Sequence, residues 1–473
     1  MEVDSKDSKE KDIKTGLEEL VNDDPDAARL AEMGYSQDLK RKFSAWSLIA
    51  VSFSLTNSWF GVSAAMITGI NSGGPILLVY GLIITGIMSV AVAISLSELA
   101  SAYPNSGGQY YWAKQLASPR YAPISSYLTG WTAYLGSIFT SASVSLSMGA
   151  AILGLWQIGH PDLFVISLSD LRLFNSVTAS ADTYRPASFV FTEFINNTGW
   201  KSDGVAFILG LINTNWPYAA IDCATHLAEE IHQPERRIPL ALMSTIALGF
   251  VTAWCFVIGM MFSLQDIDTI AATPTLVPIF EIFRQAVSEA GALGLGTLIV
   301  LTGAGCQIAC HTWQTRLCWS FARDAGLPGH KFLSHVNKEL DTPLRALTVS
   351  CIFDALIGLL YLGSSAALNS IITAVITTLY VSYSIPILCL LFRGRNNIKR
   401  GPFWCGALGL VSNIILLLWT AFTLVAYSLP SYRPVTPTNM NYISAVYVAM
   451  AVLIICDWFI RGRKSYIGHQ TSL

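Results

Sequence analysis

Polar and aromatic residues interrupt an apolar run near the beginning of the chain, in the stretch SLTNSWFGVS at residues 54–63. Asparagine, serine and glycine are poor helix formers, and here they stand at mid-depth of a run long enough to cross a bilayer. Inside lipid every backbone amide and carbonyl needs a partner, so a broken helix is tolerated only where it lines a cavity in the protein. The stretch therefore predicts a binding site for a small molecule, formed by Asn57, Ser58, Trp59, Phe60 and Gly61.

A second interruption, NTNWPY, lies at residues 213–218. Pro217 removes a helix hydrogen bond, Asn215 and Trp216 precede it, and Tyr218 follows it. Two interrupted spans in corresponding positions of two halves are typical of a transporter's central site. A single break is explained equally well by ordinary packing, whereas two breaks, each beside a tryptophan, favour a site. The aromatic rings there would hold an ammonium group by cation–π attraction, or would simply pack.

Three of the ionisable residues within or at the ends of apolar runs are candidates for function. Asp222 follows Pro217 by about one and a half turns and is a candidate for coupling transport to an ion such as the proton. The alternative is that Asp222 lies at the membrane interface and contacts water. Glu98 ends one apolar run and Arg316 lies inside another, so both are candidates for gate charges that pair across helices.

Composition assigns the chain to the membrane proteins. Of its 473 residues, 52% are hydrophobic and only 13% are charged, whereas a soluble domain carries about 25% charged residues. A net charge of -2 gives no reason to expect a nucleic-acid partner. The chain contains no phosphate-binding loop and no catalytic motif, so we expect no enzyme activity, no cofactor and no metal site. Its expected partners are the lipid bilayer, a small-molecule substrate and a coupling ion.

Hydropathy divides the chain into a mixed-charge N-terminal tail (residues 1–43), a transmembrane transporter domain (44–462) and a short C-terminal tail (463–473). The first tail is polar and charged, and we expect it to be largely disordered. About ten segments of the domain are long and apolar enough to span a bilayer. These predicted spans are residues 45–69, 75–98, 124–156, 204–226, 238–263, 291–322, 345–362, 367–392, 405–429 and 441–461.

The distribution of lysine and arginine predicts the orientation. With the N-terminus in the cytosol, 18 basic residues of the domain and its flanks lie inside and 5 lie outside, in agreement with the positive-inside rule. Both termini are then cytosolic. The N-x-[ST] triplet at Asn196 falls outside, where a glycan can be attached.

Three further stretches carry a resemblance to a known family. They are SELASAYPNSGGQYYW (97–112), THLAEEIHQPERRIPLAL (225–242) and RLCWSFARDAGLP (316–328). Together they resemble the amino acid–polyamine–organocation superfamily, in particular its fungal amino acid/choline branch. The stretches SLTNSWFG, INSGGP and LINTNWPYAAIDCATH resemble most closely the choline permeases of that branch.

The resemblance implies an all-α fold of two inverted five-helix repeats followed by two further helices. Its first and sixth helices would unwind around the substrate, at residues 57–63 and 213–218. It also implies an inner gate on the cytosolic side, whose residues would tie helix ends together. The positions that match this gate motif are Glu98, Glu230, Arg316, Arg323 and Asp324.

Two features depart from the family pattern. Amino-acid carriers have a small glycine-rich run in the first break, whose amides hold the substrate carboxylate, whereas this chain has the bulky Trp59-Phe60 pair. The pair favours an amine such as choline. The family also has twelve spans and we count ten, with the fourth and fifth apparently absent between residues 156 and 204.

The sequence thus predicts a secondary active transporter, proton-coupled as the resemblance implies, for choline or a related small amine. An amino acid, γ-aminobutyrate or an amine-containing secondary metabolite is the alternative substrate. If the fourth and fifth helices are truly absent, a transport-dead sensor or regulator remains a third interpretation. We expect the plasma membrane, with an internal membrane such as the vacuolar one as the alternative.

Overall fold

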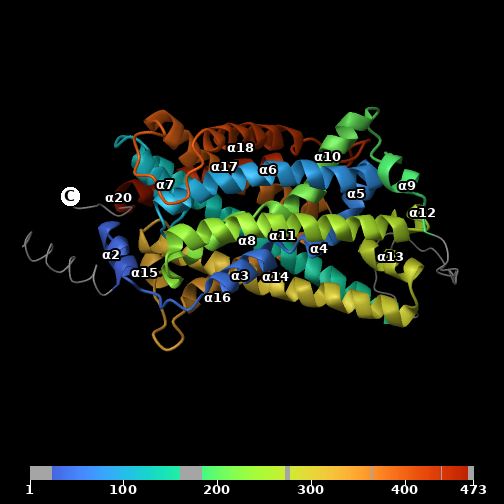
Figure 1. Cartoon of the computed structure of the whole chain (residues 1–473), viewed down its shortest axis with the longest axis horizontal. Helices are drawn as coiled ribbons and strands as arrows, with labels where there is room; N and C mark the ends of the chain where they lie inside the picture. Colours follow the sequence, from blue (N-terminus) through green and yellow to red (C-terminus); the bar gives the residue numbers. More distant parts are fainter. Residues whose placement is uncertain (1–23, 160–183, 272–276, 364–365, 438, 467–473) are drawn as a thin grey trace, which may run out of the picture.

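The computed structural model describes residues 24–159, 184–271, 277–363, 366–437 and 439–466. Every named element in these ranges is a helix, and their only β pairing is two isolated bridges. The long helices run roughly along one axis (Figure 1). One end of the bundle carries α2 (Pro25–Glu32) and the opposite end carries α9 (Ala187–Thr192); these are the α2 end and the α9 end below.

The first span is broken at the predicted position. It consists of α3 (Ala45–Thr56), α4 (Ser58–Ala64) and α5 (Met66–Ser72), and it bends by 49° before α5. Ser44 caps α3 in a reciprocal capping box with Ser47. Two long helices follow, α6 (Gly74–Ala102) and α8 (Ala122–Gly159), with the short α7 (Gln109–Leu116) between them at the α2 end.

The second set of helices begins with another broken element. The α-helix α10 (Asp203–Asn215) passes into a 3-10 turn, η1 (Trp216–Tyr218), and then into a 3-10 helix, η2 (Ile221–Glu230). It is followed by α11 (Pro234–Ser263), the short α12 (Ile267–Ala271) and α13 (Pro278–Ala286), α14 (Glu289–Arg323), the short α15 (His330–Leu333), α16 (Leu344–Gly363) and α17 (Ala366–Arg393).

Helices of the two sets pack in opposite directions, as an inverted repeat requires. The Phe43 amide donates to the Glu230 carbonyl (3.1 Å) at the α2 end, and the Asn197 amide donates to the Asn71 carbonyl (2.8 Å) at the other end. The first broken span therefore runs antiparallel to α10 and η2. Two further pairs, α6 with α11 and α8 with α14, also pack against each other in opposite directions.

The last helices are α18 (Ala407–Ala426) and α19 (Ile443–Asp457), which continues through the π-helical η3 (Trp458–Gly462) into α20 (Arg463–Ser465). They lie outside the paired set, with α18 against α6 and α17. This arrangement matches the two additional helices expected after the repeats.

The predicted count of ten spans is not confirmed. Seven described helices are long and apolar enough to cross a membrane, or eight when the bent first span is included. The predicted span 204–226 is not among them because its α-helical part ends at Asn215. The predicted span 345–362 corresponds to α16, which is also not among them.

The described residues between α8 and α10 contain one short helix, α9. The chain has only 27 residues between the end of α8 and the start of α9, and part of that stretch (160–183) lies outside the described residues. Two spans need about 40 residues, so this stretch is too short for the fourth and fifth helices of the family pattern.

Candidate functional site

The first break is built by Asn57. Its backbone adopts a φ of 23°, in the left-handed region that asparagine tolerates better than most residues. Its side-chain oxygen accepts from the Phe60 amide (3.5 Å) and caps α4, while its side-chain amide donates to the Thr302 carbonyl of α14 (2.7 Å). One side chain thus ends one helix, starts the next and fixes the break to a neighbouring helix.

The second break leaves backbone carbonyls that other helices satisfy. Tyr383 of α17 donates its hydroxyl to the Ala219 carbonyl (2.7 Å), and Thr85 of α6 donates to the Thr214 carbonyl (3.1 Å). This is the arrangement that irregular backbone at membrane depth requires. The side chain of Asn213 donates to the Val62 carbonyl on α4 (3.1 Å) and so connects the two breaks directly.

The two breaks meet at a small buried cavity. A Cβ added to Gly61 would lie 2.9 Å from Cγ of Pro217, so glycine is required for the two backbones to approach this closely. The cavity has a volume of about 20 Å³, room for about one water molecule. The space must therefore expand before it admits any molecule much larger than water.

Four of the eight predicted substrate-binding residues line this cavity: Asn57, Phe60, Gly61 and Trp216. The Phe60 and Trp216 side chains are almost completely buried, with exposed fractions of 2% and 6%. Two aromatic residues, one from each break, thus belong to the lining of one cavity.

The other four predicted residues do not line the cavity. Trp59 is half-buried and stacks on Phe256 of α11, with ring centroids 6.4 Å apart. Both side-chain atoms of Asn215 are engaged, by Tyr380 and by Tyr427. The two remaining residues, Ser58 and Tyr218, are buried, with no hydrogen-bond partner for either hydroxyl among the described residues.

Sequence reasoning missed the walls that α8 and α14 contribute. Thr140 and Val144 of α8 and Cys306 of α14 line the cavity. The Cys306 thiol donates to the Leu55 carbonyl (3.2 Å), a backbone group freed by the first break. The hydroxyl-rich run around Thr140 was a possible signal, but hydroxyls in membrane helices commonly bond the preceding turn, as Thr140 does to Gly136 (2.8 Å).

Asp222 is fully buried and lies among hydrogen-bond donors. Its carboxylate accepts from the side-chain amide of Gln109 in α7 (2.7 Å) and from the Tyr383 hydroxyl (2.7 Å). His226, one turn further along η2, places Nε2 at 3.1 Å from the same carboxylate. Asp222 is therefore shielded from water in this structure, whereas the alternative interpretation of the sequence placed it in contact with water at the membrane interface.

Buried ion pairs connect the helix ends at the α2 end of the bundle. Arg316 donates twice to Glu230 (2.8 and 3.1 Å), and Arg323 donates twice to Glu229 (2.7 and 3.0 Å). Both pairs join α14 to η2, the continuation of the second break. Four of the predicted gate residues are close together at this end: Glu230, Arg316, Arg323 and Asp324.

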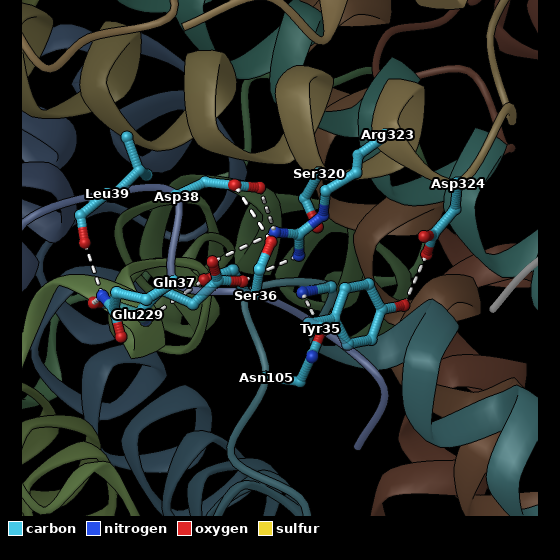
Figure 2. Close-up of polar contacts among 12 residues, drawn as sticks. Tyr35, Ser36, Gln37, Asp38, Leu39, Asn105, Glu229, Ser320, Arg323 and Asp324 are labelled. Atoms are coloured by element: carbon cyan, nitrogen blue, oxygen red, sulfur yellow. Dashed lines mark hydrogen bonds and ion pairs between the residues drawn. The ribbon is translucent and has the colours of Figure 1, made fainter. Parts of the chain in front are cut away.

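The segment 33–43 follows α2, and its residues 35–39 lie beside Arg323, Glu229 and Asp324 (Figure 2). Tyr35 donates its hydroxyl to Asp324 (2.9 Å), and Asp38 pairs with Arg323 (3.3 Å). The Arg323 guanidinium also lies over the Tyr35 ring, 4.4 Å from its centroid. Burial raises the pKa of Asp324. Part of the predicted tail is thus packed onto the ends of α14 and η2, whereas residues 1–23 lie outside the described residues.

Glu98 belongs to a separate pair. Its carboxylate accepts from Arg395 (2.8 and 3.0 Å) and from the Cys405 amide (2.8 Å), both in the connection between α17 and α18. The predicted gate thus contains two groups of charges. Arg395 and Glu229 are ion-pair partners of predicted gate residues that sequence reasoning did not identify.

Asn196 lies near the α9 end, opposite the ion pairs. Its side-chain amide donates to the Trp200 carbonyl (3.0 Å) and to Asp203 (3.0 Å), and its side-chain oxygen accepts from Thr198 (2.6 Å). It is half-exposed.

A helical bundle with two antiparallel broken spans that meet at a closed cavity is the architecture of a multi-pass membrane transporter. The sequence profile of the amino acid permeases matches residues 43–169 and 163–452. The chain belongs to this family, within the amino acid–polyamine–organocation superfamily, and it is a transporter rather than an enzyme. The two matched segments meet at residues 163–169, the region where two helices of the family pattern are missing.

Three relatives illustrate the family. The "Choline transporter" of Saccharomyces cerevisiae is 44% identical in an alignment that covers 98% of this chain and 89% of that protein. The "Transmembrane transporter swnT" of Metarhizium robertsii is 34% identical, with 94% and 96% covered. The "7-keto 8-aminopelargonic acid transporter" of Saccharomyces cerevisiae is 32% identical, with 88% and 91% covered.

Proposed function

We propose that this chain is a secondary active transporter of choline or a closely related small amine, driven by protons. The observation that carries the substrate class is the cavity between the two breaks, whose lining includes Phe60 from the first break and Trp216 from the second. Aromatic faces attract a quaternary ammonium without removing its charge, and the attraction strengthens when the site excludes water.

The polar groups of the cavity support a cation rather than a carboxylate. The hydroxyls of Thr56 and Thr140 and the amide of Asn57 all donate to backbone carbonyls of the protein itself. Donors already engaged in this way are poor ligands for an anion, whereas carbonyl oxygens and aromatic faces suit an ammonium. The similarity to a yeast choline transporter agrees with this substrate class.

A second candidate substrate is an amino acid or an amine-containing metabolite. The relatives include carriers named for 7-keto 8-aminopelargonic acid and for swainsonine, so the family accommodates more than one amine. The engaged donors of the cavity favour choline over these compounds, and competition by each class of compound discriminates between them.

The predicted orientation complements this function. With both termini in the cytosol, the ion pairs at the α2 end form the inner gate. The half-exposed Asn196 then lies on the outside, and a glycan there would replace the two hydrogen bonds that its side-chain amide makes. We propose the plasma membrane as the site of uptake. Glycosidase treatment checks the orientation, because a mass shift that disappears in Asn196→Gln is expected, and labelling of Asn196 from the cytosolic side would contradict it.

The shortened first repeat is the main challenge to a transport function. The second set contains helices α16 and α17, and the described residues hold no counterparts for them between α8 and α10. A sensor that binds choline without moving it is the competing function. The cavity between the breaks and the ion pairs at the α2 end nevertheless form without those counterparts, which favours a working carrier.

Uptake of radiolabelled choline by a yeast strain that lacks its own choline carrier tests the proposal. This chain is compared with a version whose two missing helices are restored from a relative. Saturable uptake by the short chain, inhibited by unlabelled choline and increased by an inward proton gradient, is expected. Uptake by the restored chain alone would favour the sensor, and uptake by neither would remove choline as the substrate.

A further inference from the structure

A buried histidine–aspartate pair lies beside the cavity and has no role in the ion pairs of the gate. His226 and Asp222 are one turn apart on η2, and both side chains are completely buried. Nδ1 of His226 lies 2.8 Å from the Ser106 carbonyl, and Nε2 lies 3.1 Å from Oδ2 of Asp222. Each ring nitrogen therefore has one defined partner.

The donors and acceptors around the pair require one hydrogen between the side chains of His226 and Asp222. A carbonyl oxygen can only accept, so the Nδ1 atom of His226 carries a hydrogen. Without a second proton, the Nε2 lone pair would face a carboxylate oxygen at hydrogen-bond distance, with no hydrogen between two acceptors. One proton on Nε2 or on Oδ2 removes this conflict and makes the pair neutral overall, which a fully buried site strongly favours.

Among the described residues, none of the groups that face Asp222 supplies a free charge that neutralises it. Gln109 of α7 and Tyr383 of α17 face its carboxylate as neutral donors, and the Trp313 ring of α14 lies 6.5 Å from the His226 ring. Cys223 on the same helix is a buried thiol. Arg316 of α14 also faces this part of η2, but it is occupied by Glu230 through two hydrogen bonds.

Tyr383 connects this pair to the cavity. Its hydroxyl lies 2.7 Å from Oδ1 of Asp222 and 2.7 Å from the Ala219 carbonyl, and Ala219 lines the cavity. A hydroxyl has one hydrogen and satisfies only one of these acceptors at a time. A protonated His226 would donate to the Asp222 carboxylate, which then competes less strongly for the tyrosine hydrogen. The protonation state of the pair therefore influences whether the tyrosine holds the aspartate or the backbone of the second break.

We propose that His226 and Asp222 together bind the coupling proton and that Tyr383 transmits its presence to the substrate cavity; this inference rests on the proposed proton-driven transport. On loading, a hydronium ion transfers a proton to the pair, an N–H bond forms at Nε2 of His226, and water is left. On release this bond breaks and water takes the proton. No electrons move and no further reactant is required.

Two transport measurements on the full chain in yeast vesicles test the inference. Choline exchange at equal pH reports substrate binding and movement, and accumulation under an inward proton gradient reports coupling. In His226→Gln and Asp222→Asn we expect gradient-driven accumulation to fall by about tenfold or more while exchange persists. In the unsubstituted chain, choline exchange measured at a series of equal inside and outside pH values should increase as the pH falls. In both variants choline exchange should depend less on pH.

A second histidine–aspartate pair provides the matched control. His311 of α14 lies 3.4 Å from Asp354 of α16 and is partly exposed. His311→Gln should therefore leave accumulation and the pH profile unchanged. Normal gradient-driven accumulation in His226→Gln, or its loss in His311→Gln alone, would overturn the inference. Absence of choline exchange in the unsubstituted chain would instead refute the proposed substrate.

Tyr383→Phe provides a further test if the pair variants do not reach the membrane. It keeps both members of the pair and removes only the hydroxyl between Asp222 and Ala219. We expect exchange to remain and accumulation to weaken. Unchanged accumulation in this variant would overturn the role of the tyrosine as the connection to the cavity.

Discussion

The cavity between the breaks and the ion pairs at the α2 end are held together by different forces. The cavity wall has no charged residue among its described lining, and its polar groups are satisfied by backbone within the protein. The α2 end instead joins η2 to α14 through buried arginine–carboxylate pairs, and a more exposed pair between Asp38 and Arg323 adds the segment 33–43.

The difference has a mechanical consequence. Apolar walls can separate in small steps, because each lost contact costs little. A buried ion pair has two states of low free energy: the partners are paired and excluded from water, or they are separated and both are hydrated. Intermediate states are unfavourable because they leave a buried charge without a partner. The α2 end is therefore suited to act as a two-state gate, whereas the cavity is suited to adapt its size to a substrate.

The largest predicted effect comes from breaking one member of a buried pair. Arg316→Met leaves Glu230 buried without its partner and should destabilise the closed protein by about 3–5 kcal/mol. Surface expression and thermal unfolding of the solubilised protein measure this loss. The double variant Arg316→Met with Glu230→Met should recover most of the stability. A single variant as stable as the parent would show that this pair does not close the α2 end.

The next effect distinguishes the two tryptophans beside the breaks. Trp216 lines the cavity and Trp59 stacks on α11. Trp216→Ala should weaken apparent choline affinity by about 2 kcal/mol, or roughly thirtyfold. The matched control Trp59→Ala should change affinity much less at equal surface expression. Equal losses of choline affinity in both variants would mean that Trp216 contributes no more to the substrate site than Trp59 does.

Gly61→Ala tests the close approach of the two breaks. Its added methyl group would lie 2.9 Å from Cγ of Pro217, so the backbones must shift. Uptake should fall several-fold while the protein still folds, because overpacking costs about 1–3 kcal/mol. Gly149, where an added Cβ meets nothing within 4 Å, is the control position. Uptake in Gly61→Ala as high as in Gly149→Ala would place the substrate elsewhere.

The smallest effect is expected at the exposed edge of the gate. Asp38 pairs with Arg323 but is itself substantially exposed, and exposed pairs contribute at most about 1 kcal/mol. Asp38→Asn should leave stability nearly unchanged and increase the rate of inward release slightly. A loss comparable to that of Arg316→Met would show that the segment 33–43 contributes as much to closure as the buried pairs.

The positions of both breaks were predictable, whereas the side chains that face the cavity were not. Asn57 and Pro217 carry local signals for ending a helix, and such signals act in any tertiary context. Which of Trp59 and Phe60 faces the cavity depends on the turn at Asn57, where the regular spacing of helical side chains is lost. The walls from α8 and α14 depend on packing between helices, which has no local signal.

The charges show the same contrast. Arg316 was recognisable because a lone arginine inside an apolar run needs a partner, and the structure provides Glu230. The partner of Glu98 was not recognisable, because Arg395 lies in a connection whose path depends on the whole fold. His226 was overlooked although its four-residue spacing from Asp222 places both on one helix face.

The central claim is that the two breaks form an amine site in this shortened chain. Competition-tested uptake of radiolabelled choline, in yeast lacking its own choline carrier, tests it most directly when the parent, Trp216→Ala and Trp59→Ala are compared at equal surface expression. We predict saturable uptake by the parent, strongly weakened affinity in Trp216→Ala and near-normal affinity in Trp59→Ala. No uptake by the parent, or unchanged affinity in Trp216→Ala, would contradict the claim.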